Sequence, residues 1–169
     1  AIASYGIGVR ILSFMIIPSL GFSMATSTLV GQNIGALKFD RAKEVARIAN
    51  WTIFIVLSLA GLGFFIGAEF VLNLFVPGEV EVIQGGKAFI QIIALTFGLV
   101  GVQQVVSGAL RGGGSTLTAM LLAILSLWVF RFPVAYVLSK HTSLQQDGIW
   151  WSFAISNVLA ASVSWIILS

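Results

Sequence analysis

The sequence predicts an all-α, polytopic membrane protein with five transmembrane helices. Charged residues make up only 9% of the chain and hydrophobic residues 58%, whereas soluble domains carry about 25% charged residues. No Asp, Glu, Lys or Arg occurs within residues 11–37, 48–68, 88–110, 112–130 or 148–169. At about 1.5 Å of rise per residue, roughly 20 helical residues cross a hydrocarbon core of about 30 Å. Each uncharged stretch therefore predicts one span.

We place the five spans at about residues 11–34, 48–73, 88–109, 117–138 and 148–168. The first contains Pro18 and Gly21, and the fourth reaches full length only with its tail from Arg131 to Leu138, which contains Pro133. Proline cannot donate a hydrogen bond to the carbonyl four residues back, and its ring bends a helix. We therefore expect breaks in these two spans and name Pro18, Gly21 and Pro133 as candidate hinges.

Small residues recur at helical spacing in the third and fifth spans. They are Ala94, Gly98, Gly101 and Gly108 on one face of the third, and Ser152, Ser156, Ala160 and Ser164 on one face of the fifth. Such stripes let helix backbones approach closely in lipid, where no hydrophobic drive for association exists. We expect a packed bundle.

Polar residues form separate stripes. Thr96, Gln103 and Ser107 lie nearly opposite the glycine face of the third span, and Ser23 and Ser27 stand one turn apart in the first. Polar groups in hydrocarbon need partners, so these side chains face either another helix or a watery cavity. The sequence leaves both interpretations open.

Positive residues between the spans predict the orientation. One side carries Lys38, Arg41, Lys43, Arg47 and Arg111, against Arg10, Lys87 and Lys140 on the other. The positive-inside rule makes the first side cytoplasmic. Residues 40–50 are predicted to be helical, with Asp40 as the N-cap and with Lys43 and Arg47 on a face that can meet lipid phosphates.

Two ionisable residues lie within or at the end of a span. Arg131 either snorkels to the outer headgroups or faces a polar interior, and Glu69 is expected at the outer interface. No carboxylate lies at mid-depth in any predicted span. The start at Ala1, with neither an initiator Met nor a basic region before the first apolar run, leads us to expect a piece of a longer protein.

Several function classes are excluded. The chain has no Cys, and His141 is its single histidine, so no metal site is predicted. Residues 111–116, Arg-Gly-Gly-Gly-Ser-Thr, lack the residue order of a P-loop and fit a turn whose Ser115 or Thr116 caps the next helix. The sequence contains neither paired acids nor a nucleophile with a neighbouring base, so nothing in it predicts an enzyme. The cations lie in short loops between spans, which argues against nucleic acid as a partner.

Three segments carry short motifs whose order and spacing are informative. The first, residues 29–36, contains Gly31, Gln32, Gly35 and Ala36; the second, residues 108–116, contains Arg111 and Gly112; the third, residues 131–136, reads Arg-Phe-Pro-Val-Ala-Tyr. Together they resemble the two cytoplasmic signatures and the Arg-x-Pro-x-Ala-Tyr stretch of multidrug and toxic compound extrusion (MATE) transporters. The second departs from the family pattern, with Gly and Ser where Gly-Asp or Gly-Glu pairs are common.

The resemblance implies twelve helices in two six-helix lobes that open alternately to each side of the plasma membrane, which is the inner membrane in a bacterium. The five spans would be helices 8 to 12, so the expected partners are the bilayer and an N-terminal lobe outside this sequence. The implied activity is export of organic cations or other amphipathic small molecules in exchange for protons or sodium, with no cofactor. Helix 10 of this chain has no acidic residue, which favours protons, with the ion site outside this segment. The resemblance and helical geometry together place Ser23, Ser27, Thr96, Gln103, Ser107 and Arg131 as candidates for the substrate cleft.

Other functions stay open at this point. A lipid-linked saccharide flippase of the same superfamily would show similar helices, usually with more cations in its cavity, where only Arg131 is available. A membrane scaffold subunit would use the polar stripes to bind partner helices. A membrane enzyme ranks third, for want of a catalytic constellation.

Overall fold

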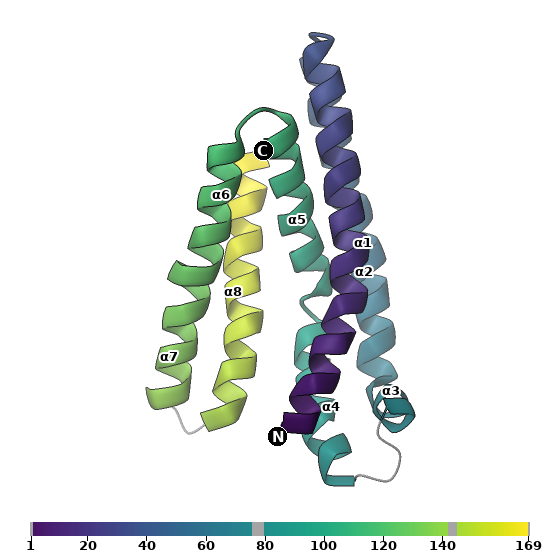
Figure 1. The fold of residues 1–169 in the computed structure, drawn as a ribbon, viewed down its shortest axis with the longest axis vertical. Coiled ribbons are helices and arrows are strands. Elements are labelled where there is room, and N and C mark those ends of the chain that lie inside the picture. Colours follow the sequence, from purple (N-terminus) through teal and green to yellow (C-terminus); the bar gives the residue numbers. More distant parts are fainter. Residues whose placement is uncertain (1, 76–79, 142–144, 169) are drawn as a thin grey trace.

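The computed structural model describes residues 2–75, 80–141 and 145–168, and each of these ranges is helical apart from short turns (Figure 1). The elements are α1 (Ile2–Gly35), α2 (Phe39–Ile66), α3 (Ala68–Phe75), α4 (Val80–Ala94), α5 (Phe97–Gly112), α6 (Thr116–Ile124), the π-helix η1 (Leu125–Arg131), α7 (Phe132–His141) and α8 (Gln145–Leu168). Helix α5 packs against α1, α2 and α8, and α8 also packs against η1 and α7. The predicted all-α membrane fold is confirmed.

Three of the described helices are long and apolar enough to cross a membrane, and the number is four if one bent pair of helices counts as a single span. Three are single helices, Ser13–Gly35, Phe39–Ile66 and Thr116–Val137, and the fourth is the pair Gly86–Ala94 and Phe97–Gly112, bent by 47°. Within the last helix, Ala154–Ile167 is apolar as well. The count of five spans therefore stays a prediction.

Helix α2 covers the helix predicted at residues 40–50 and most of the second predicted span, whose bounds stay a prediction. It begins at Phe39, and its first turns bury Ala42, Ala46 and Asn50 while their other faces are exposed. Asp40 is not the N-cap, because that position belongs to Lys38, without a side-chain bond. The helix ends at Ile66, since the chain turns at Gly67 and restarts as α3.

The two prolines do not break their helices. Helix α1 continues through Pro18, which is exposed, so the lost hydrogen bond changes the helix only locally. Before Pro133 the backbone widens into the π-helix η1, whose end is marked by a bond from the Phe132 N–H to the Leu127 carbonyl, five residues back. Such a turn accommodates a missing donor without interrupting the span. The hinge roles of these residues stay predictions.

The predicted small-residue stripes lie where helices meet. A Cβ on Gly98 or Gly101 would contact residues of α2, and a Cβ on Gly108 would contact the backbone of Ser23 in α1. On α8, Ser152, Ser156, Ala160 and Ser164 are all buried. The prediction of a closely packed bundle is confirmed.

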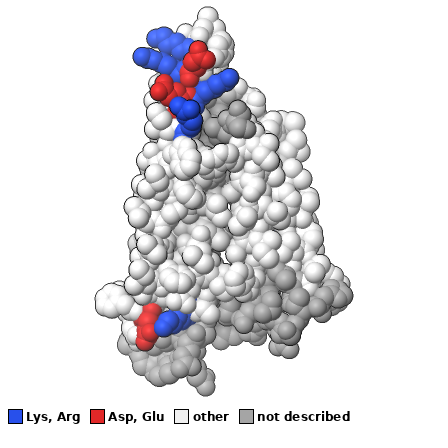
Figure 2. Space-filling model, turned by 180° about the vertical axis from the view of Figure 1, so that it is seen from behind, with Lys and Arg blue, Asp and Glu red and all other residues white. Residues whose placement is uncertain are grey.

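Charged side chains gather at the two ends of the face shown in Figure 2, with an uncharged band between them. One end carries the charged residues of the first turns of α2. The opposite end carries an ion pair in which Lys87 Nζ lies 2.9 Å from Glu69 Oε2, with both side chains partly exposed. This distribution fits a molecule whose middle is surrounded by hydrocarbon, with Glu69 at an interface as expected.

Candidate functional site

A cavity of about 310 Å³ lies where α1, η1, α8 and the bend between α4 and α5 meet. Its polar lining residues are Thr96, Gln103, Gln104, Ser126, Arg131 and Asn157. The remaining lining is apolar, for example Met15 and Ile93. An apolar cavity with a few convergent polar groups is the usual form of a small-molecule site.

The bend between α4 and α5 positions Thr96 at this cavity. The Thr96 N–H and hydroxyl both donate to the Ile93 carbonyl, at 2.9 and 2.8 Å, which closes a tight turn at the end of α4. Asn157 of α8 donates from Nδ2 to Thr96 Oγ1 at 3.2 Å. The bend is therefore tied to α8 through a buried polar pair.

The π-helix aligns polar groups on the other wall. In a π-helix, residues five apart lie on nearly the same face because each turn is wider than in an α-helix. Ser126 and Arg131 have this separation, and both line the cavity. Arg131 is half-buried at this cavity, and its role stays a prediction.

The structure brings together only some of the predicted cleft residues. Thr96, Gln103 and Arg131 share the cavity. Ser23 lies instead in the contact between α1 and α5, where its hydroxyl donates to the Gln104 carbonyl and accepts a bond from Arg111 at 2.9 Å. Ser27 presents its backbone to Gly112 in the same contact, and Ser107 is half-buried without lining the cavity.

The two signature segments meet each other at one end of the molecule. A Cβ on Gly31 would lie 3.3 Å from the Gly112 carbonyl oxygen, so the α1 and α5 backbones nearly touch. The Gln32 carbonyl accepts a bond from the Ala36 N–H in the turn that follows Gly35. The turn after each helix contains a residue with positive φ, Leu37 at 59° after α1 and Gly114 at 82° after α5. Each turn is a Schellman motif, closed by bonds from Lys38 to Asn33 and from Ser115 to Leu110.

Three lining residues were missed by the sequence reasoning. Asn157 follows directly after Ser156 of the small-residue stripe, and its amide in an uncharged span was an available signal. Ser126 was not predicted, because in a regular α-helix residues five apart, such as Ser126 and Arg131, lie on different faces. Gln104 was passed over for Gln103, since one residue in a helix changes the face by about 100°.

Hydroxyl, amide and guanidinium groups supply the chemistry of the cavity. Among the described residues no carboxylate lines it, and no group of three possible metal ligands occurs. Amides and hydroxyls both donate and accept hydrogen bonds, while the apolar wall contacts hydrocarbon parts of a ligand.

Comparison with known proteins shows the family. The sequence profile of the MatE family matches residues 1–137. The chain belongs to the MatE family. It is 30% identical over 163 residues to the probable multidrug resistance protein YoeA of Bacillus subtilis, covering 94% of this chain and 35% of that protein. It is also 30% identical over 151 residues to the probable multidrug resistance protein NorM of Thermotoga maritima, covering 89% of this chain and 32% of that protein.

Solved MATE structures share the fold. The MATE transporter ClbM in complex with Rb⁺ superposes with a TM-score of 0.92 at 23% identity, over 99% of this chain and 39% of that one. An outward-facing multidrug resistance MATE transporter of the MOP superfamily superposes with a TM-score of 0.91 at 22% identity, over 98% of this chain and 37% of that one. The chain thus spans about a third of the length of its curated relatives. As a MATE family member with apolar helices, it is a multi-pass protein of the plasma membrane.

Proposed function

We propose that this chain is part of the C-terminal lobe of a secondary antiporter, which exports organic cations or other amphipathic compounds in exchange for an ion by alternating access. Family membership and the multidrug resistance names of the relatives support export of drug-like compounds. The main structural support for this proposal is the cavity at the bend between α4 and α5, where six polar side chains lie opposite an apolar wall. A mixed lining of this kind suits amphipathic substrates of varied structure.

The exchanged ion is a proton rather than sodium. A sodium site commonly includes a carboxylate among its oxygen ligands, whereas the described lining of this cavity has only neutral oxygen atoms and the positive guanidinium of Arg131. Coupling then uses an acidic residue in the N-terminal lobe. The bend held by Thr96, together with Pro18, Gly21 and Pro133, supplies the local adjustments that alternating access requires.

Gln103→Leu in the full-length protein tests the role of the cavity. We expect the variant to insert normally and to change which compounds it exports, because the amide is exchanged for an apolar group of similar size. The measurement is drug resistance and efflux across a panel of amphipathic compounds in cells expressing equal amounts of protein. Thr118→Leu is the matched control, since Thr118 is exposed on α6 away from the cavity. An unchanged profile for every compound would contradict the proposal.

Labelling of Gln103→Cys separates a transporter from a membrane scaffold. In a full-length background without other cysteines, a transporter should react with a membrane-impermeant maleimide from one side of the membrane, and a bound substrate should slow the reaction. A scaffold whose polar stripe meets a partner helix would react from neither side.

The second candidate function is the flipping of lipid-linked saccharides, which is supported by Arg131 in the lining of the cavity. Arg recognises phosphate groups through charge-assisted hydrogen bonds. Translocation of a fluorescent pyrophosphate-linked lipid by reconstituted full-length protein, abolished by Arg131→Gln, would favour this alternative.

A further inference from the structure

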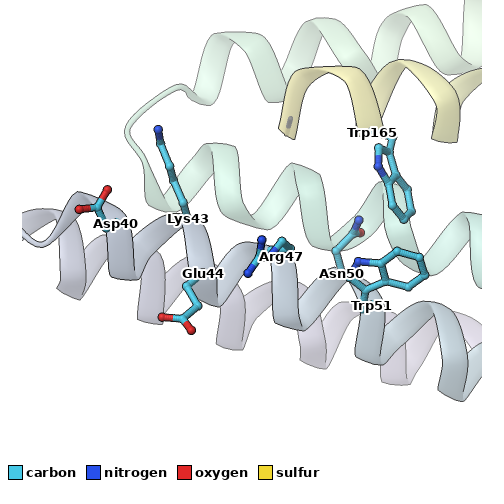
Figure 3. Close-up of a pocket in the computed structure, with 7 residues that line it drawn as sticks. All are labelled: Asp40, Lys43, Glu44, Arg47, Asn50, Trp51 and Trp165. Carbon is cyan, nitrogen blue, oxygen red and sulfur yellow. The ribbon is translucent and has the colours of Figure 1, made fainter.

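A second and larger groove, of about 550 Å³, lies between the start of α2 and the end of α8. Its described lining has no residue in common with that of the cavity at the bend of α5. Figure 3 shows Lys43, Arg47, Asn50 and Trp51 along α2, with Trp165 of α8 opposite. The groove lies at the end of the molecule that the positive-inside rule predicts to be cytoplasmic.

Asn50 is the strongest sign that this groove binds a ligand. The residue is only 4% exposed, it lines the groove, and its Oδ1 has no hydrogen-bond partner among the described residues. A buried acceptor without a partner is destabilising, because it has lost its bond to water and gained none in return. A ligand that donates a hydrogen bond at this position would remove that destabilising effect.

Two cations in the lining indicate the charge of the ligand. Lys43, Arg47 and Asn50 follow one another at spacings of four and three, so they share one side of α2. In Figure 3, Lys43 and Asn50 point to the side on which Trp165 lies, whereas Glu44 points away from it. Asp40 and Glu44 also line the groove, so its lining holds two acids and two cations. In Figure 3, Asp40 lies at the end far from Asn50, and Arg47 is the charged residue next to Asn50. The part of the groove beside Asn50 therefore favours an anionic group such as a phosphate.

The two tryptophans indicate the level in the bilayer at which the groove lies. The rings of Trp51 and Trp165 meet edge to face with centroids 5.1 Å apart, and tryptophan concentrates at the level of the lipid headgroups. On α2, the side chains of Ile55, Leu59 and Leu62 continue from Trp51 as an exposed apolar stripe. Cationic and amide groups at the headgroup level, with an apolar stripe next to them, match the two parts of a phospholipid.

We propose that this groove is a binding site for an anionic phospholipid whose headgroup carries hydroxyl groups, of the phosphatidylglycerol type. The phosphate lies between Lys43 and Arg47, a headgroup hydroxyl donates to Asn50 Oδ1, and the acyl chains follow the apolar stripe of α2. The site is independent of the transported compound, so it stands or falls separately from the proposed function.

Native mass spectrometry of the full-length protein in detergent, titrated with lipids of identical acyl chains, tests the charge requirement. We expect phosphatidylglycerol to bind more tightly than phosphatidylcholine or phosphatidylethanolamine. Each cation near a lipid phosphate contributes roughly fivefold in affinity, so Lys43→Gln with Arg47→Gln should weaken binding about 25-fold. The matched control is Lys38→Gln with Arg41→Gln, which removes two cations of the same segment that do not line the groove. An equal loss in both double variants, or equal binding of the three lipids, would overturn the proposal.

Phosphatidylmethanol tests the contact with Asn50, because it has the same charge as phosphatidylglycerol and no headgroup hydroxyl. The parent protein should prefer phosphatidylglycerol about fivefold, as expected for one net hydrogen bond of about 1 kcal/mol. Asn50→Ala should bind both lipids equally. Equal affinities in the parent would refute the assigned contact even if the Asn50→Ala variant failed to fold.

Discussion

On one side of α5, Gly108 and Gly112 lie against the backbone of α1, while on another side Gln103 and Gln104 border the cavity. The first side has no room for a single methyl group, and the Ser23 hydroxyl adds a bond to the α5 backbone. The second side meets η1 and α8 across a cavity of about 310 Å³. The same helix therefore has a closely packed face and a loosely packed one.

The difference indicates which parts of the lobe move together. Helices that touch through glycine backbones have few alternative packings, so α1 and α5 should behave as one rigid unit. Across the cavity, the described lining holds a polar link between the α5 bend and α8, the bond from Asn157 to Thr96. Rearrangement during a transport cycle is expected at the cavity rather than between α1 and α5.

Gly108→Ala is expected to give the largest effect, because the added Cβ would meet the Ser23 backbone oxygen and force α1 away from α5. Overpacking of this kind costs about 1 to 3 kcal/mol. The midpoint of thermal unfolding of the full-length protein in detergent should fall accordingly.

The matched control for this variant is Gly21→Ala. Gly21 lies within α1, and apart from the neighbouring backbone of α1 itself no described atom lies within 4 Å of the position that an alanine methyl group would take. Alanine there should stabilise the helix by about 0.5 to 1 kcal/mol. If both variants changed the unfolding midpoint in the same direction by similar amounts, the rigid contact between α1 and α5 would be refuted.

Ser23→Ala should have an intermediate effect. The substitution removes one bond to the Gln104 carbonyl and the acceptor of the Arg111 side chain, for a cost of about 1 kcal/mol. Ser19→Ala is the control one turn away, since Ser19 is equally buried but donates to the Met15 carbonyl of its own helix. A loss of stability no greater than that of Ser19→Ala would show that the bond between the helices contributes nothing.

The packed face of α5 was predictable from the sequence, and the cavity face was predictable only in part. Small residues such as Gly101 and Gly108 repeat at helical spacing whatever lies opposite, so the stripe alone predicted close packing. Gln103 and Thr96 were found because they are polar in an apolar span. Ser126 and Asn157 were not, because their meeting depends on the π-helix and on the approach of α8, which are tertiary effects. For Ser23 the sequence left a cleft and a helix contact equally open, and the structure shows its hydroxyl bonded to a backbone carbonyl of α5.

Asn157→Ala should have the smallest effect on stability and yet change transport. Its bond to Thr96 is long, at 3.2 Å, and joins two neutral groups. Hydrogen bonds between membrane helices contribute about 0.6 kcal/mol on average. A double-mutant cycle with Thr96→Val should return this value as the coupling energy.

The same variant should affect transport more than stability. Because the bond ties the bend between α4 and α5 to α8, its loss should alter the rate of efflux more than the unfolding midpoint. Unchanged efflux in Asn157→Ala, at a measurable coupling energy, would assign the pair to folding alone and place the moving boundary elsewhere in the lobe.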